Sequence, residues 1–244
     1  MFHDVTAVLF DLDGTLVNTI ELILAAHEHA FRQHLRGPWP ARAAIIMNFG
    51  RPLRDALCEY AAADGQPDPV ALAPRMVATY RAFQHAHHDR LVKAYDGMRE
   101  TLVALRERGY PLGVVTSKVE GIARVVIGQF DLAPLMDVSV FLENTERHKP
   151  EPDPLLEAAR RGRFEARDAL YVGDSIHDIA AGRAAGMKTA GALWGPFERS
   201  DLEAAGPDVL VERPRDLLAL LPGVGQAPHT RQPRRSPGRL PNPR

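Results

Sequence analysis

Two carboxylates separated by one residue, Asp11 and Asp13, stand in the segment Phe10-Asp11-Leu12-Asp13-Gly14-Thr15. On an extended strand their side chains would point to opposite sides, so the chain must turn after Asp11 for both to serve one site, and Gly14 permits such a turn. One carboxylate can then attack phosphorus and become an aspartyl phosphate, while the other protonates the leaving oxygen and later deprotonates water. A structural turn with solvated acids is the alternative interpretation.

A second acidic pair occurs in Gly173-Asp174-Ser175-Ile176-His177-Asp178. Asp174 follows a predicted strand, and Asp178 lies one helical turn later on the same face of the next predicted helix. Together with Asp11 these residues would place three carboxylates side by side, which is too much negative charge to remain unpaired. A hard divalent cation with oxygen ligands resolves the repulsion, and Mg²⁺ is the ion that commonly binds carboxylates together with a phosphate.

Groups that can bind a phosphate occur at two further positions. Thr116 and Ser117 follow a predicted strand, where hydroxyl and backbone N–H groups can bind a phosphoryl oxygen, although a helix N-cap would use the same residues. Lys149 lies in a predicted loop and could neutralise both the Asp11 carboxylate and the phosphoryl charge. It could instead be a surface lysine, but the chain has only four lysines against 26 arginines.

These residues need a parallel sheet whose strands all end at one edge. Short apolar, β-branched runs predict buried strands at 5–10, 111–115, 169–172 and 188–193, with weaker candidates at 136–142 and 208–211. Helical patterns at 100–108, 154–161 and 177–185 alternate with them. The alternation predicts an α/β doubly wound domain, and in open sheets of this kind ligands bind at the edge formed by the carboxyl ends of the strands.

Residues 18–89 interrupt this alternation with helices and no convincing strand. The predicted helices cover 19–35, 52–63 and 69–88, and the last carries a stripe of Leu72, Met76, Tyr80 and Phe83. We therefore predict a core domain at 1–17 and 90–221 with a helical domain inserted at 18–89. Residues 222–244 carry five arginines and no acid, and they are rich in Pro and Gly, so we expect a disordered tail.

The overall composition argues against several other classes of protein. A net charge of −1 over 244 residues gives no global reason to expect nucleic acid or a membrane surface as a partner. The single cysteine, Cys58, excludes an intrachain disulfide and is expected to be buried. No targeting signal or apolar run of about 20 residues is visible, so we expect a cytoplasmic protein. The sequence leaves the choice between a monomer and a homodimer open.

In their order along the chain, these signals resemble the four motifs of the haloacid dehalogenase (HAD) superfamily, and the match covers about residues 5–213. The helical insert resembles the C1 cap of that superfamily, which closes over the site. The resemblance implies that Asp11 is nucleophile and metal ligand, and that Asp13 is general acid/base and offers its backbone carbonyl to Mg²⁺. It implies that Thr116 and Lys149 hold the phosphoryl group, beside which we expect Ser117, and that Asp174 binds the metal, with Asp178 as a ligand or a support for one.

Within the superfamily the chain is similar to phosphoglycolate phosphatases and more closely to HAD-type bacterial pyrophosphatases. This similarity rests on the segments 18–23, 49–55, 80–89 and 149–154. We therefore expect inorganic pyrophosphate as the substrate, with 2-phosphoglycolate or another small phosphomonoester as the alternative. Arg51 and Arg54 could bind a second anionic group of such a substrate, or they could be solvated.

Other activities fit the sequence less well. A phosphomutase of this superfamily would want a histidine where the chain has Ile23, and a phosphonoacetaldehyde hydrolase would need a cap lysine, whereas residues 18–88 contain no lysine. A phosphate-binding protein without activity would not need all four acids. The cluster of His85, His87 and His88 could suggest a second metal, but neighbouring side chains at a helix end diverge, so we favour a hinge role.

Overall fold

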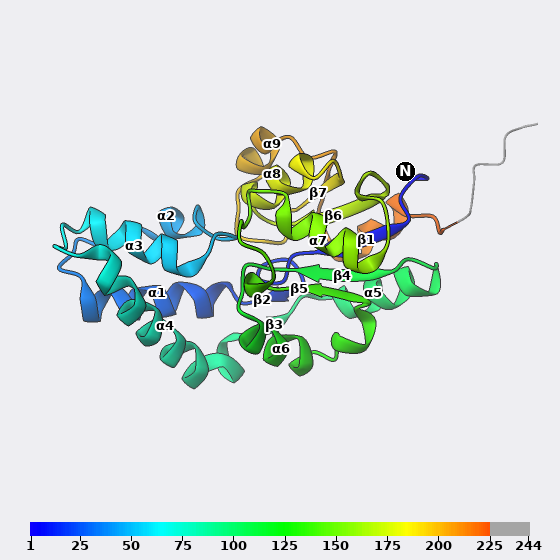
Figure 1. The fold of residues 1–244 in the computed structure, drawn as a ribbon. Coiled ribbons are helices and arrows are strands. Elements are labelled where there is room, and N and C mark those ends of the chain that lie inside the picture. The colour runs from blue at the N-terminus through cyan, green and yellow to red at the C-terminus, as the bar shows by residue number, and fades with distance from the viewer. Residues whose placement is uncertain (225–244) are drawn as a thin grey trace, which may run out of the picture.

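Six parallel strands form one sheet in the computed structural model, which describes residues 1–224 (Figure 1). The order across the sheet is β5-β4-β1-β6-β7-β8. The α/β doubly wound fold predicted from the sequence is confirmed, and every predicted strand is present, including the two weaker candidates. Their bounds are β1 Ala7–Phe10, β4 Leu112–Val115, β5 Val138–Val140, β6 Ala169–Gly173, β7 Lys188–Ala192 and β8 Val209–Val211.

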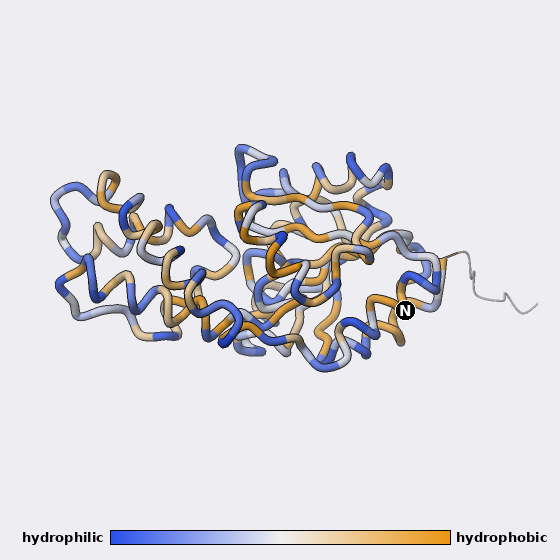
Figure 2. The backbone as a smooth tube through the Cα atoms, turned by 90° about the horizontal axis from the view of Figure 1, so that it is seen from below, coloured by the Kyte–Doolittle hydropathy of each residue, from blue (hydrophilic) through white to orange (hydrophobic). Residues whose placement is uncertain are grey.

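Helices cover both faces of this sheet, and the side chains of β1 point alternately into the two hydrophobic cores between the sheet and these helices. Val8 and Phe10 point into a core shared with α5 (Met98–Glu107) and α6 (Glu120–Gln129). Ala7 and Leu9 point the other way, into a core shared with α7 (Asp153–Gly162) and α8 (Ile176–Ala184). In Figure 2 the hydrophobic colour accordingly runs along the strands. With both faces covered, the carboxyl edge is where polar groups can meet.

Strand β1 lies at the centre of the sheet, between β4 and β6. After β1 the chain forms β4 and β5 on one side of this strand. It then forms β6, β7 and β8 on the other side. The end of β1 is therefore the point at which the strand order reverses, and Asp11 is the first residue after it.

Four helices lie to one side of the sheet, coloured from blue through cyan to blue-green in Figure 1: α1 Ile20–His34, α2 Arg42–Ile46, α3 Leu53–Ala63 and α4 Pro69–Leu91. The Asp68 carboxylate accepts a hydrogen bond from the Ala71 N–H and so caps α4. Met76 and Tyr80 of the predicted stripe are buried, and Leu72 and Phe83 are half-buried. Cys58 is also half-buried, not buried as predicted, because it lies toward the edge of the buried face of α3.

The strands β2 (Val17–Asn18) and β3 (Lys93–Ala94) form a small antiparallel pair where the chain leaves the sheet and returns to it. We predicted no strand there, because two residues are too few to show a period. Helix α4 also extends three residues beyond its predicted end. Short helices complete the fold: α9 Arg199–Ala205, α10 Leu217–Leu220, and 3₁₀ turns at Ala133–Leu135, Leu142–Asn144, Ala166–Asp168 and Pro214–Asp216.

The segment predicted as a tail begins with residues that contact the core. The Gly223 N–H donates to the Tyr110 hydroxyl and the Val224 N–H to the Arg108 carbonyl, at 3.2 and 3.0 Å. Residues 225–244, the rest of that segment, lie outside the described residues. Among the described residues no helix has the length and apolar character needed to cross a membrane.

Candidate active site

The loop after β1 brings Asp11 and Asp13 to the same edge of the sheet. The Asp11 N–H donates to the Val172 carbonyl and so ties the loop to β6, and Gly14 then adopts a φ of 89° that favours glycine. The Gly14 N–H donates to the Val17 carbonyl, which closes a tight turn. The turn expected at Gly14 is therefore present.

Lys149 connects two of the buried acids. Its Nζ donates to Asp11 Oδ1 at 2.7 Å and to Asp178 Oδ1 at 2.6 Å, and the lysine side chain is only 1% exposed. Its third hydrogen bond goes to the Tyr171 hydroxyl, at 3.1 Å. All three protons of the ammonium group thus have acceptors, so this buried charge is compensated.

Asp174 lies beside this pair in a narrow space. Its Oδ1 accepts a hydrogen bond from the Thr15 hydroxyl, and the Trp194 indole N–H in turn donates to the Thr15 carbonyl at 2.9 Å. A Cβ atom at Gly14 would lie 2.5 Å from Asp174 Oδ2, and one at Gly195 would lie 2.2 Å from Asp174 Cβ. Both glycines are therefore needed for the backbone to approach Asp174 this closely.

Burial and mutual repulsion shift the protonation of these acids. Burial raises the pKa of Asp11 to about 7, against the attraction of Lys149. Burial, followed by the Asp178 and Asp11 charges, raises the pKa of Asp174 well above its usual range. For Asp178, burial acts upward as well, but the ion pair with Lys149 and its hydrogen bonds leave the pKa below the usual value. Asp174 is thus the acid whose charge the protein compensates least.

Asp11, Asp174 and Asp178 can each direct an oxygen to one position, since these atoms lie within 4.8 Å of one another. Within residues 1–224, no hydrogen bond is donated to Asp11 Oδ2 or Asp174 Oδ2. Asp178 is different, because both of its oxygens already accept bonds from Lys149, Tyr171 and Ser175. Three buried carboxylates with one ammonium group fit a divalent cation that has Asp11 and Asp174 as ligands and Asp178 as the support that orients Lys149.

Asp13 belongs to a separate ion pair. The Lys118 ammonium contacts its Oδ1 and Oδ2 at 2.7 and 2.6 Å, and the Thr19 hydroxyl donates to Oδ1 at 2.7 Å. The side chains of Lys118 and Asp13 are 11% and 19% exposed. The Asp13 carboxylate therefore has its own counterion and is distinct from the cluster around Lys149.

Thr116 and Ser117, at the end of β4, make different contacts. The Thr116 hydroxyl is buried and accepts a hydrogen bond from the Lys118 N–H at 3.2 Å. The Ser117 hydroxyl donates to the Gly50 carbonyl at 2.6 Å, so it contacts the loop that connects α2 and α3. A second bond joins the same loop to α8, where the His177 Nε2–H donates to the Met47 carbonyl at 3.0 Å. The helices α1–α4 are thus held closed over the site.

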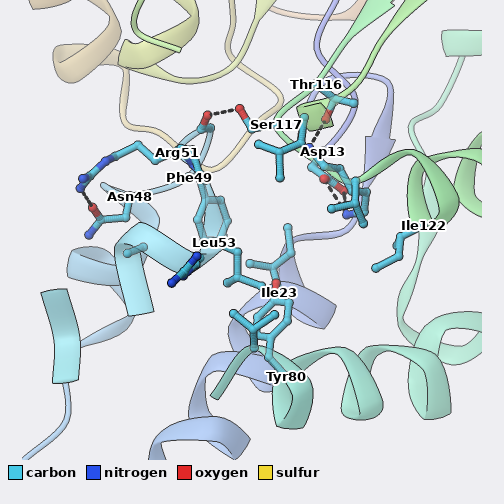
Figure 3. A pocket seen from close by; sticks show the side chains of 18 of the residues that line it. Asp13, Ile23, Asn48, Phe49, Arg51, Leu53, Tyr80, Thr116, Ser117 and Ile122 are labelled. Carbon is cyan, nitrogen blue, oxygen red and sulfur yellow. Dashed lines mark hydrogen bonds and ion pairs between the residues drawn. The ribbon is translucent and has the colours of Figure 1, made fainter. Parts of the chain in front are cut away.

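A cavity of about 160 Å³ lies between the sheet edge and these helices (Figure 3). Asp11, Asp13, Thr116 and Lys118 line it from the sheet side. The helical side supplies the apolar Ile23, Phe49 and Leu53 together with Tyr80, and these four side chains face the cavity in Figure 3. A small polar molecule at Asp11 would therefore be partly enclosed.

The two arginines predicted to contact a substrate differ in their surroundings. Arg51 makes a bidentate ion pair with Glu59 and a hydrogen bond to Asn48, and Figure 3 shows it directed toward Asn48 and away from Asp13. Arg54 is exposed, lines the cavity and makes no ion pair with any described residue. Of the two guanidinium groups, only that of Arg54 could bind a substrate without first breaking an ion pair.

The histidines near the site do not form a second cluster of metal ligands. The only group of acids, histidines or cysteines within the described residues that converges on one point is Asp11, Asp174 and Asp178, so His85, His87 and His88 do not. His27 lines the cavity, and burial lowers its pKa to about 4, so its ring is neutral at pH 7. Its Nδ1–H donates to the Ile23 carbonyl at 2.9 Å.

Several residues of the site were not predicted from the sequence: Lys118, Thr15, Tyr171, Ser175 and His177. The scarcity of lysine, which drew attention to Lys149, applies equally to Lys118. Ser175 and Asp178 form a capping box at the start of α8, and this spacing is visible in the sequence. Nothing in the sequence signals that the Tyr171 hydroxyl lies beside Lys149, because that contact depends on the packing of β6 against the loop before α7.

Comparisons with known proteins find a matching family model and similar relatives. A family model described as haloacid dehalogenase-like hydrolase matches residues 8–192. A protein of Anoxybacillus flavithermus named pyrophosphatase PpaX is 37% identical over 218 residues, which are 89% of this chain and 97% of that protein. A protein of Bacillus pumilus with the same name is 37% identical over 217 residues, 89% of this chain and 96% of its own length.

Solved structures show the same fold. A hydrolase from Pseudomonas syringae has a TM-score of 0.78 and 26% identity, covering 88% of this chain and 96% of its own. A predicted phosphoglycolate phosphatase from Haemophilus somnus 129pt also has a TM-score of 0.78, at 22% identity, covering 89% and 98%. The sheet and the four helices beside it therefore occur together in other proteins.

Proposed function

This chain belongs to the haloacid dehalogenase-like hydrolase family, and we propose that it is a Mg²⁺-dependent phosphohydrolase whose preferred substrate is inorganic pyrophosphate. The observation that carries the proposal is the position of Asp11 and the hydrogen bonding of its two carboxylate oxygens. Asp11 lines the cavity, its Oδ1 is held by Lys149, and its Oδ2 accepts no hydrogen bond from the described residues. One Asp11 oxygen is thus oriented by the buried Lys149 ammonium, while the other has no partner among the described residues, so the carboxylate can serve both a metal ion and an incoming phosphoryl group.

In the first half of the proposed reaction an Asp11 oxygen attacks phosphorus, and the bond from phosphorus to the leaving oxygen breaks. Asp13 gives a proton to that oxygen, so that one phosphate leaves and an aspartyl phosphate remains. In the second half Asp13 takes a proton from water, whose oxygen attacks the same phosphorus and releases Asp11. The products are two phosphates from one pyrophosphate and one water.

The other residues hold charge in place. A divalent cation bound by Asp11, Asp174 and the Asp13 backbone carbonyl would offset the negative charge on the phosphoryl group. Lys149 would stay on Asp11 and neutralise part of the same charge, with Asp178 fixing its position. Thr116 and Ser117 would contact phosphoryl oxygens, and for Ser117 this requires its hydroxyl to leave the Gly50 carbonyl. We propose that Arg54, not the ion-paired Arg51, contacts the rest of the substrate.

Pyrophosphate is placed first because relatives 37% identical to this chain are named pyrophosphatase. The cavity supports a small anion as well, since four cationic side chains line it, those of Arg51, Arg54, Arg81 and Lys118. 2-Phosphoglycolate is also a small anion of this kind and remains the alternative substrate. A cytoplasmic location and a monomeric or dimeric state stay predictions.

Phosphate release from pyrophosphate, 2-phosphoglycolate and glucose 6-phosphate, measured with Mg²⁺ and with a chelator, tests the proposal. Asp11→Asn and Asp13→Asn should each lower kcat at least about a hundredfold, the usual scale for a lost nucleophile or acid/base group. Asp89→Asn is a matched control, because the Asp89 side chain is fully exposed. Near-normal turnover by Asp11→Asn, or no requirement for a divalent cation, would contradict the mechanism. A preference of about tenfold or more for 2-phosphoglycolate would reverse the order of substrates.

A further inference from the structure

The ion pair between Lys118 and Asp13 lies within the cavity and includes the carboxylate proposed to exchange a proton with the substrate. The Lys118 ammonium contacts both oxygens of Asp13, at 2.7 and 2.6 Å, and both side chains line the cavity. The Thr19 hydroxyl occupies a further acceptor site on Oδ1. A group that exchanges a proton with substrate must come within about 2.6–3.2 Å of the substrate oxygen. Asp13 cannot offer an oxygen in that way while the ammonium group covers both.

The side chain of Lys118 can move without disturbing the loop that carries it. The backbone of this residue is held separately, with its N–H on the Thr116 hydroxyl and its carbonyl accepting from the Leu142 N–H at 3.1 Å. The four-carbon stem of a lysine is flexible and its ammonium is a compact charge that can change partner. A second anion in the cavity would compete with Asp13 for it.

The charges that line the cavity favour such an anion. Among the described residues, Asp11 and Asp13 are its only acids, and both lie on the sheet side. Arg54 and Arg81 come from the helices opposite and make no ion pair with any residue in the described range 1–224. A negative group in the space between Asp13 and these helices would therefore face cations.

We propose that Lys118 is the residue that binds an anionic leaving group and that this binding frees Asp13 to act. The inference rests on the proposed function and narrows its substrates to phosphate esters or anhydrides that carry a second negative group next to the scissile oxygen. The ammonium group keeps its three protons and only exchanges the Asp13 carboxylate for the substrate anion. A substrate with an uncharged leaving group would leave the ion pair in place and react more slowly.

Lys118→Met tests this role, because methionine keeps much of the stem and removes the charge. For wild type and variant, kcat/KM is measured with pyrophosphate, with 2-phosphoglycolate and with phenyl phosphate, whose leaving group has no charged substituent. We expect the ratio of the anionic substrates to phenyl phosphate to fall at least about tenfold in Lys118→Met. Lys118→Arg, which keeps the charge, should recover most of that ratio. Lys188→Met is the matched control. Lys188 is the first residue of β7, whereas the site lies at the carboxyl ends of the strands, and its ammonium pairs with Asp208 at 3.7 Å.

A binding measurement without turnover separates recognition from catalysis. In an Asp11→Asn background with Mg²⁺ present, Lys118→Met should raise the Kd of pyrophosphate at least about tenfold. An equal loss of kcat/KM on all three substrates, or an unchanged Kd, would overturn the role of Lys118 and leave the proposed function standing. A wild-type protein that releases no phosphate from any of the three substrates would overturn the proposed function itself.

Discussion

Removing the buried ammonium of Lys149 should destabilise the protein strongly even when no substrate is present. Lys149→Met leaves Asp11 and Asp178 buried without the cation that now lies 2.7 and 2.6 Å from their oxygens. Breaking a buried ion pair by removing one partner costs about 3–5 kcal/mol. For a domain of this size that corresponds to a fall in Tm of roughly 6–20 °C.

The assay is thermal and urea unfolding at pH 7.5 in a chelating buffer, so that no metal replaces the lost charge. Lys188→Met serves as the control, because its partner is 3.7 Å away and its side chain is 40% exposed, and such surface pairs contribute at most about 1 kcal/mol. Adding Asp178→Asn to Lys149→Met should recover part of the loss, since one unpaired charge is removed. If Lys149→Met unfolds within about 1 kcal/mol of the wild type, Asp11 and Asp178 do not depend on this ammonium group for their burial, and the reasoning is refuted.

Three further outcomes follow from the site. The pKa of Asp11 is about 7 in the folded protein and lies above the usual 3.8, so between these pH values the folded protein holds a proton that the unfolded chain has lost. In the metal-free protein Asp11 should therefore contribute a fall of about 2–3 kcal/mol in unfolding free energy between pH 5 and pH 8, and the raised pKa of Asp174 acts in the same direction. A flat profile in urea titrations over this range would contradict the shift. Asp174→Asn should leave the metal-free protein at least as stable at pH 8 and abolish its stabilisation by Mg²⁺; a shift in Tm with Mg²⁺ that matches the wild type would argue against Asp174 as a ligand. His177→Ala removes the hydrogen bond to Met47 and should raise KM about two- to twelvefold while His85→Ala does not; equal KM values would show that this bond does not help to close the site.

The sequence predicted those parts of the fold that depend on local pattern. Each strand of the main sheet is a short apolar run, and the acids at 11 and 174 stand directly after two of them. Helix α6 was missed because its sequence, EGIARVVIGQ, combines two glycines with several β-branched residues and so shows no helical preference. Strands β2 and β3 were missed because each has only two residues and because they pair with each other across about 75 positions of the chain.

Which side chains of the site contact one another was harder to predict than which residues belong to it. Lys118 and Asp13 are 105 positions apart, and Lys149 and Asp11 are 138 apart, so both ion pairs depend on the packing of separate loops at the edge of the sheet. Asp178 could be placed near Asp174 from its spacing alone. That its oxygens are already used by Lys149, Tyr171 and Ser175, which favours a supporting role over that of a metal ligand, depends on contacts in three dimensions.

The two lysines divide the four acids of the site into parts with different tasks. Lys149 balances Asp11 and Asp178, where a phosphoryl group would be bound and transferred, and Lys118 balances Asp13, where a proton would be exchanged. Asp174 has a hydroxyl donor but no ion pair with any described residue, and its pKa is raised accordingly. A protein that compensates three acids and leaves the fourth is arranged for a positive charge supplied from outside. This is why Asp174→Asn should not lower the stability of the metal-free protein and should remove the response to Mg²⁺.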